Sequence, residues 1–133
     1  MSDEVSIVIR SYFPITDSAF IYSSWRNASY YGGKERADAK AFFKRKTGLI
    51  RDVVAKASVR IACVEGDPMT IVGYSVATGS HLEFIYVKVE FRGKGIGKLL
   101  MPKDIRTVTP NLTKIGTMIA QKKGLIIGPP QDE

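Results

Sequence analysis

The stretch that decides the fold is "IYVKVEFRGKGIGKLL", from Ile85 to Leu100. It opens with β-forming residues and closes with "IGKLL", which suits the start of a helix. Between these parts lie Gly93, Gly95 and Gly97, each separated from the next by one residue. Glycine lacks a Cβ and adopts positive φ without strain, so a backbone rich in glycine can turn tightly and approach a ligand closely. The stretch therefore predicts a strand, a glycine turn and a helix.

This junction has the chemistry of an anion site. The start of a helix offers unpaired backbone N–H groups and a positive dipole end, and Arg92, Lys94 and Lys98 add positive charge. A P-loop is excluded because Leu99 stands where that motif needs Ser or Thr. A Rossmann fingerprint is excluded because the spacing is G-x-G-x-G and the preceding strands suit antiparallel pairing. We interpret the turn as a cradle for a pyrophosphate; a tight turn with incidental glycines is the alternative.

The chain predicts one domain over residues 1–133, with the order strand, helix, helix, strand, strand, strand, helix, strand, helix, strand. Gly48 leaves open whether the second helical region is one long helix or two short ones, and Pro102 requires the helix after the glycine turn to be short or kinked. The turn "GDP" predicts a hairpin between the second and third strands. The expected elements are strands at 5–10, 58–65, 69–78, 81–89, 107–109 and 125–128, and helices at 16–31, 34–57, from 95 and at 111–123.

Composition limits the function only broadly. A net charge of +7 favours an anionic partner, which could be a cofactor phosphate, a nucleic acid or an acidic protein surface. No apolar run approaches the roughly 18 residues of a membrane span, and the N-terminus does not resemble a secretory signal. The single cysteine, Cys63, lies in an apolar run and is expected to be a buried, inert thiol. We expect a cytoplasmic protein with no metal site and no membrane partner.

The segment "YVKVEFRGKGIGKLL" resembles motif A of the GNAT superfamily of N-acetyltransferases, whose consensus is R/Q-x-x-G-x-G/A. Arg92, Gly95 and Gly97 fill the consensus positions, and the order of elements resembles the family core from residue 5 to residue 128. The resemblance implies an α/β (α+β) GNAT fold, with a mixed central sheet of about six strands flanked by helices.

The resemblance also implies acetyl-CoA as the cofactor. In the family a bulge in the fourth strand splits the sheet and frees backbone groups that hold the pantetheine arm. Matched position by position, the main chains of Ile85 and Val87 would contact the acetyl and pantetheine portions, and Asn111 would touch the CoA arm. The backbone N–H groups expected at the pyrophosphate belong to Arg92, Gly93, Lys94, Gly95, Ile96, Gly97 and Lys98.

Transfer of an acyl group to an amine requires a base. The two-residue period of a strand places residues 81, 83, 85 and 87 on one face, so His81 and Glu83 are both expected to face the acceptor. His81 matches the position of the glutamate that acts as the base in the histone-acetylating branch. Glu83 lies two residues closer to Ile85 along the strand. The alternatives are a surface histidine and a glutamate paired with a lysine.

A general acid is harder to find. Many relatives place a tyrosine on the helix that follows the fifth strand, but "NLTKIGTMIAQKKG" has none. Thr113, Thr117, a water molecule, Tyr74 and Tyr86 stay open as proton donors.

Acceptor specificity in the family comes from the first helices and their loops. The corresponding residues here are Tyr22, Trp25, Arg26, Tyr30 and Tyr31. The helical spacing that includes Trp25 is also typical of core packing, and the tyrosine pair beside two glycines suits the rim of a site.

The leading hypothesis is an N-acetyltransferase that moves an acetyl group from acetyl-CoA to a primary amine of a small molecule or protein. Homodimers are common in the family. One alternative is a phage-type enzyme that modifies DNA bases, like the Mom proteins, because "FIYSSW" resembles the first helix of small phage GNAT-like proteins. The other is a non-catalytic GNAT-fold protein that binds a host protein, which the missing tyrosine permits.

Overall fold

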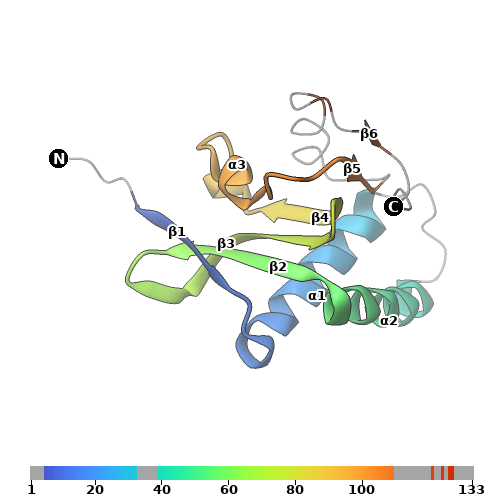
Figure 1. The fold of residues 1–133 in the computed structure, drawn as a ribbon. Coiled ribbons are helices and arrows are strands. Elements are labelled where there is room, and N and C mark those ends of the chain that lie inside the picture. The colour runs from blue at the N-terminus through green and yellow to red at the C-terminus, as the bar shows by residue number, and fades with distance from the viewer. Residues whose placement is uncertain (1–4, 33–38, 110–120, 122–123, 125, 128–133) are drawn as a thin grey trace.

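A computed structural model describes residues 5–32, 39–109, 121, 124 and 126–127; for residues 29–32, 39–43 and 127 it describes the backbone alone (Figure 1). The described strands form one six-stranded sheet in the order β1-β2-β3-β4-β5-β6. Pairing is antiparallel from β1 to β4 and parallel from β4 to β6. The predicted mixed sheet flanked by helices is confirmed.

The elements follow the predicted order. The strands are β1 (Ile7–Ser11), β2 (Ser58–Val64), β3 (Asp67–Thr78), β4 (His81–Val87), β5 (Thr107–Val108) and β6 (Ile126–Ile127). The helices are α1 (Pro14–Gly32), α2 (Ala39–Lys56) and α3 (Ile96–Leu100), with a 3₁₀ turn, η1 (Val89–Phe91), after β4. Of the helix expected at 111–123, the structure describes residue 121 alone, which is helical; its expected cap, Asn111, lies outside the described residues.

Three local expectations are settled. α2 is one continuous helix through Gly48. The predicted hairpin between β2 and β3 is confirmed; its turn lies at Glu65 and Gly66, where Gly66 has φ +81°, and the other two residues of "GDP", Asp67 and Pro68, already belong to β3. β4 ends at Val87, because the chain enters η1 at Val89.

Two apolar clusters cover the two faces of the sheet, with α1 and α2 on one face and α3 on the other (Figure 1). The α3-side cluster comprises Ala62, Val72, Ala77, Leu82, Ile85, Val87, Ile96, Leu100, Met101, Ile105 and Val108. The cluster under α1 and α2 comprises Ile21, Trp25, Ile50, Val54, Ile61, Ile71, Tyr74, Val76 and Phe84. The central strands are therefore buried on both sides. Over the described ranges, no helix is both long and apolar enough to cross a bilayer.

β4 carries a bulge at Glu83. On β3, Val76 pairs with Phe84 and the next residue, Ala77, pairs with Leu82, so Glu83 is an extra residue on β4. An extra residue interrupts the alternation of side chains and bends the strand locally. This bulge lies on the strand for which the GNAT resemblance implies one.

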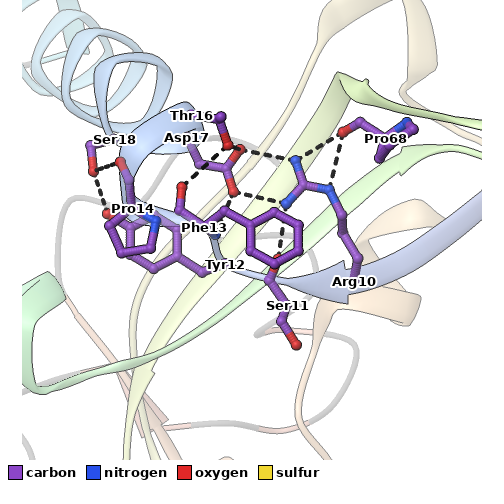
Figure 2. Close-up of polar contacts among 9 residues, drawn as sticks. All are labelled: Arg10, Ser11, Tyr12, Phe13, Pro14, Thr16, Asp17, Ser18 and Pro68. Carbon is purple, nitrogen blue, oxygen red and sulfur yellow. Dashed lines mark hydrogen bonds and ion pairs between the residues drawn. The ribbon is translucent and has the colours of Figure 1, made fainter.

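A partly buried ion pair connects β1 to α1 and β3. The guanidinium of Arg10 donates to both carboxylate oxygens of Asp17, at 2.8 and 2.9 Å, and to the carbonyls of Pro68 and Ser11 (Figure 2). The Asp17 side chain is fully buried and also accepts the backbone N–H of Phe13 at 2.8 Å. Both charged groups are therefore bonded on several sides, which offsets their loss of hydration.

This network determines how the stability of the fold changes at acid pH. Burial acts to raise the pKa of Asp17, but the hydrogen bonds from Arg10 and from the Phe13 N–H outweigh it, so the pKa is lowered from its ordinary value. A carboxyl group with a lowered folded-state pKa stabilises the fold fully above about pH 4, and this stabilisation is lost as the pH falls through the folded-state pKa.

We expect Asp17→Asn to lower the free energy of unfolding at neutral pH by about 3 kcal/mol, because Arg10 then lacks its charged partner. The difference from the wild type should narrow as the pH falls toward about 2. Urea denaturation across this range measures both effects. The matched control is Asp52→Asn on the exposed surface of α2, which should change stability by less than about 0.5 kcal/mol. Equal effects of the two substitutions would contradict the assigned role of the pair.

Gly73 allows β3 and β4 to lie close together. A Cβ added at Gly73 would lie 2.5 Å from the backbone oxygen of Tyr86 and 3.3 Å from the Cδ1 atom of Leu100. The first contact is with backbone and cannot be relieved by rotating a side chain. Position 73 therefore requires the absence of a side chain.

Gly73→Ala should destabilise the fold by about 1–3 kcal/mol through overpacking, measured as a lower urea midpoint. Gly48→Ala is the control, since a Cβ there meets nothing within 4 Å. Alanine is favoured over glycine in a helix by about 0.5–1 kcal/mol, so this variant should be slightly more stable than the wild type. If both variants shifted the midpoint in the same direction, the close approach at Gly73 would be refuted.

Candidate functional site

The glycine turn links the end of β4 to α3. Gly93 has φ +79° and Gly95 has φ +81°, a conformation that favours glycine, and Gly95 is the N-cap of α3. The Leu99 N–H donates to the Gly95 carbonyl at 3.3 Å, which begins the helical hydrogen bonds. The N–H groups of the first helical residues precede this bond and have no helical partner. The structure thus forms the strand, glycine turn and helix that the sequence predicts.

Arg92 folds back onto β4. Its Nε atom donates to the Val87 carbonyl at 2.9 Å, and its backbone N–H donates to the Val89 carbonyl at 3.3 Å. Two of the groups expected to contact the cofactor, the Val87 carbonyl and the Arg92 N–H, are therefore engaged within the protein. Lys94, on the turn, and Lys98, in α3, are both exposed, and the Lys94 ammonium lies over the Phe91 ring, 5.6 Å from its centroid.

α3 is held against the sheet by packing and by one buried hydrogen bond. Ile96 and Leu100 are buried in the α3-side cluster. The buried hydroxyl of Ser75, on β3, donates to the Leu100 carbonyl at 2.7 Å. Ser75 was not predicted from the sequence, since a single serine in a strand gives no sign of its partner. These contacts fix the position of the glycine turn relative to β3 and β4.

β5 meets β4 at the start of β4 only. The pairs are His81 with Thr107 and Leu82 with Val108, and the N–H of Thr109 donates to the Leu82 carbonyl at 2.9 Å. β5 ends there, while β4 continues to Val87. The parallel neighbour therefore accompanies β4 only to the residue before the bulge.

His81 and Glu83, the two candidate bases, lie together at this point. The ring atoms Nδ1 and Nε2 of His81 are hydrogen-bonded to Thr107 Oγ1 at 2.7 Å and Thr109 Oγ1 at 2.8 Å. Glu83 accepts from the Thr78 hydroxyl at 2.9 Å and from Thr109 at 3.5 Å, and lies 3.8 Å from His81 Nε2. The side chain of Glu83 is 20% exposed and that of His81 only 4%. Of the two, Glu83 is the one that solvent or a substrate reaches.

The bulge corrects one expectation about this strand. Ile85 and Val87 pack in the α3-side cluster together with Leu82, whose side chain lies on the opposite face from those of its neighbours His81 and Glu83. The prediction that positions 81, 83, 85 and 87 share one face was therefore wrong. The two-residue period fails because the strand contains an extra residue.

The sequence also did not single out the threonines of this cluster. Thr107 and Thr109 alternate in "TVT", so both side chains point to one side of β5, toward His81. The alternation was a usable signal. Its meaning depended on knowing that β5 lies beside the start of β4.

The residues expected at the acceptor divide between core and surface. Trp25 is 6% exposed and stacks on Phe84 with ring centroids 4.7 Å apart, so its assignment to substrate binding was wrong. Arg26 bonds the Thr47 hydroxyl of α2 at 3.1 Å and links the two helices. Tyr22 is half-buried against the cluster under the helices. The side chains of Tyr30 and Tyr31 lie outside the described part of the structure.

Tyr74 is unsuited to donate a proton. Burial raises the pKa of its hydroxyl, which is hydrogen-bonded to the Ser24 hydroxyl at 2.7 Å and donates to the Ile21 carbonyl at 3.2 Å. Tyr86 is half-buried between Phe20 and Tyr74. Thr113 and Thr117 lie outside the described residues.

Within the described ranges no group of three or more His, Cys, Asp or Glu side chains could hold a metal ion, and Cys63 is buried.

Proteins with related sequences or folds include several acetyltransferases. A 65-residue segment, 49% of the chain, is 32% identical to the peptidyl-lysine N-acetyltransferase YjaB of Salmonella typhimurium, but the match spans only 43% of that protein. The solution structure of the apo-form of YjaB from Escherichia coli aligns with a TM-score of 0.52 and 18% identity, over 71% of this chain and 61% of that one. A proposed acetyl transferase from Pyrococcus furiosus aligns with a TM-score of 0.60 and 15% identity, over 96% and 85%. No family model matches the chain.

The chain therefore has the GNAT fold. Its resemblance to the GNAT superfamily, first indicated by Arg92, Gly95 and Gly97, is confirmed. The further resemblance to small phage proteins stays a prediction.

Proposed function

We propose that the protein is an N-acetyltransferase that uses acetyl-CoA and acetylates a primary amine. The observation that carries this proposal is the glycine turn at the end of β4, with Gly93 and Gly95 at positive φ and α3 fixed behind them by Ser75. It supplies backbone N–H groups beside the two exposed lysines Lys94 and Lys98, which suits a pyrophosphate.

In this proposal β4 and the glycine turn would hold the cofactor. The N–H groups of residues 93–98 hold the pyrophosphate, and the main chains of Ile85 and Val87 accompany the pantetheine arm. The Arg92 guanidinium donates to the Val87 carbonyl, and in this proposal it would exchange this partner for a cofactor oxygen. Bound acetyl-CoA supplies an activated acyl group, and the residues of this chain orient it and receive the proton of the amine.

Glu83 is the proposed base. Its carboxylate is the more exposed of the two candidates, and it accepts hydrogen bonds from Thr78 and Thr109 that hold it in place to remove a proton. His81, nearly enclosed, has both ring nitrogens engaged by threonines. We retain two candidates for the general acid. One is Tyr86, which is half-buried on β4 three residues after Glu83, and the other is a water molecule.

The acceptor class is taken from the curated relative, a peptidyl-lysine N-acetyltransferase. A lysine side chain is a primary amine on a flexible stem, and the half-buried Glu83 carboxylate would attract its charged form before removing a proton. The first acceptors to test are therefore lysine-containing peptides, with peptides of the same sequence and acetylated lysines as blanks.

Calorimetric titration with acetyl-CoA tests the cofactor site. We expect Gly95→Trp to weaken binding at least tenfold, because the indole would obstruct the phosphates at the turn. Gly66→Trp is the matched control, since both glycines have φ +81° and open space around an added Cβ, but Gly66 lies in the distant β2–β3 turn. Both variants bear similar backbone strain. Normal binding by a folded Gly95→Trp variant would show that the cofactor site is elsewhere.

Glu83→Gln should lower kcat/KM for peptide acetylation by about 100-fold, as expected for the loss of a general base, with little change in acetyl-CoA affinity. The control is Glu90→Gln in η1, an exposed glutamate outside the cluster, which should retain activity. Full activity of Glu83→Gln would remove Glu83 from the chemistry.

A further inference from the structure

The hydrogen bonds around His81 and Glu83 form a single chain. Thr107 Oγ1 lies 2.7 Å from His81 Nδ1, His81 Nε2 lies 2.8 Å from Thr109 Oγ1, and Thr109 Oγ1 lies 3.5 Å from Glu83 Oε2. The Thr78 hydroxyl closes the chain on Glu83 Oε1 at 2.9 Å. His81 is 3% exposed, so its ring nitrogens depend on these partners and not on solvent.

When Glu83 is ionised, donors and acceptors fix one direction for this chain. A carboxylate only accepts, so Thr109 donates its single hydroxyl proton to Glu83. The oxygen of Thr109 must then accept from His81, which requires the proton of the neutral ring to be on Nε2. The bare Nδ1 accepts from the Thr107 hydroxyl. Every polar group in this chain of hydrogen bonds then has a suitable partner.

When Glu83 is protonated, the same chain runs in the opposite direction. The carboxylic acid donates to Thr109 Oγ1, and Thr109 donates to His81 Nε2. The ring proton is then on Nδ1 and is donated to Thr107. The two states differ by one proton, which resides on Glu83, while the imidazole exchanges one N–H for the other and stays neutral.

We propose that Thr109 is a positioning residue that couples the protonation of Glu83 to the tautomer of His81. The catalytic meaning of this coupling rests on the proposed acetyltransferase function, but the coupling itself does not. Its benefit is that Glu83 can gain and lose a proton without placing a charge on a buried imidazole, which would be costly in free energy. The N–H of Thr109 donates to the Leu82 carbonyl, and this bond holds Thr109 at the junction.

The surroundings of the unit support the assignment. Among the described residues, His81 is the ionisable side chain that contacts the Glu83 carboxylate, and the remaining contacts come from the hydroxyls of Thr78 on β3 and Thr109 after β5. The tautomer of His81 is therefore controlled by hydroxyl groups whose direction Glu83 sets.

The sequence makes the test direct, because His81 is the single histidine of the chain. Protein labelled with ¹⁵N-histidine gives one imidazole signal set in a long-range ¹H–¹⁵N spectrum, and the two nitrogen shifts identify the protonated nitrogen. At about pH 8, above the range in which histidine ordinarily gains a proton, the wild type should carry its proton on Nε2. In Glu83→Gln the side-chain amide donates to Thr109, as the protonated acid would, and the proton should move to Nδ1.

Variants of Thr109 separate coupling from mere packing. In protein that already carries Thr109→Val, adding Glu83→Gln should no longer exchange the two nitrogen shifts. In protein that carries Thr109→Ser, adding Glu83→Gln should exchange them, because serine keeps the hydroxyl. Circular dichroism confirms that each variant is folded. The proposal is overturned if wild type and Glu83→Gln share one tautomer, or if the exchange persists with Thr109→Val.

The outcome is independent of the proposed enzyme function. A tautomer exchange in a protein that neither binds acetyl-CoA nor acetylates peptides would support the coupling and overturn the acetyltransferase proposal. An active enzyme without the exchange would overturn the coupling alone. In an active enzyme, Thr109→Val should also lower kcat for peptide acetylation, since Glu83 loses a positioning partner, and Thr109→Ser should restore it.

Discussion

The bulge at Glu83 is the constraint on which the arrangement of the site depends. One additional residue on β4 lets Leu82 and Ile85 point into the same core cluster, which leaves Glu83 beside His81 at the junction with β5. A regular strand would place His81, Glu83 and Ile85 on one face, so the two polar side chains would share their face with the apolar cluster. The bulge thus separates an apolar wall from a polar cluster within a few residues of one strand.

The sequence predicted those features that depend on local chemistry. Gly93 and Gly95 predicted a turn with positive φ, and Pro102 predicted that the helix before it would be short or kinked. The structure shows the turn and a short helix. The period of apolar residues also gave the order of strands and helices. Local chemistry was sufficient because each of these features is determined by the conformational limits of one or two residues.

Features that depend on distant partners could not be predicted in the same way. Trp25 was ambiguous because its stacking partner, Phe84, lies on another element, and the bulge was invisible because it is a mismatch between two strands. The role of Arg10 and Asp17 was likewise missed, since their charges gave no sign that they would be buried together. In each case the missing information was the identity of the neighbour and not the preference of the residue.

The unequal pairing of the sheet has a consequence for its motions. β2, β3 and β4 are joined along most of their length, whereas β5 is joined to β4 by two residue pairs. Sheets open first where fewest backbone bonds must break together. A local opening at β5 would carry Thr107 and Thr109 away from His81 while the antiparallel strands stay intact. The hydrogen bonds of His81 and Glu83 with Thr107 and Thr109 therefore join the more stable antiparallel part of the sheet to the less stable parallel part. They are lost whenever β5 separates from β4.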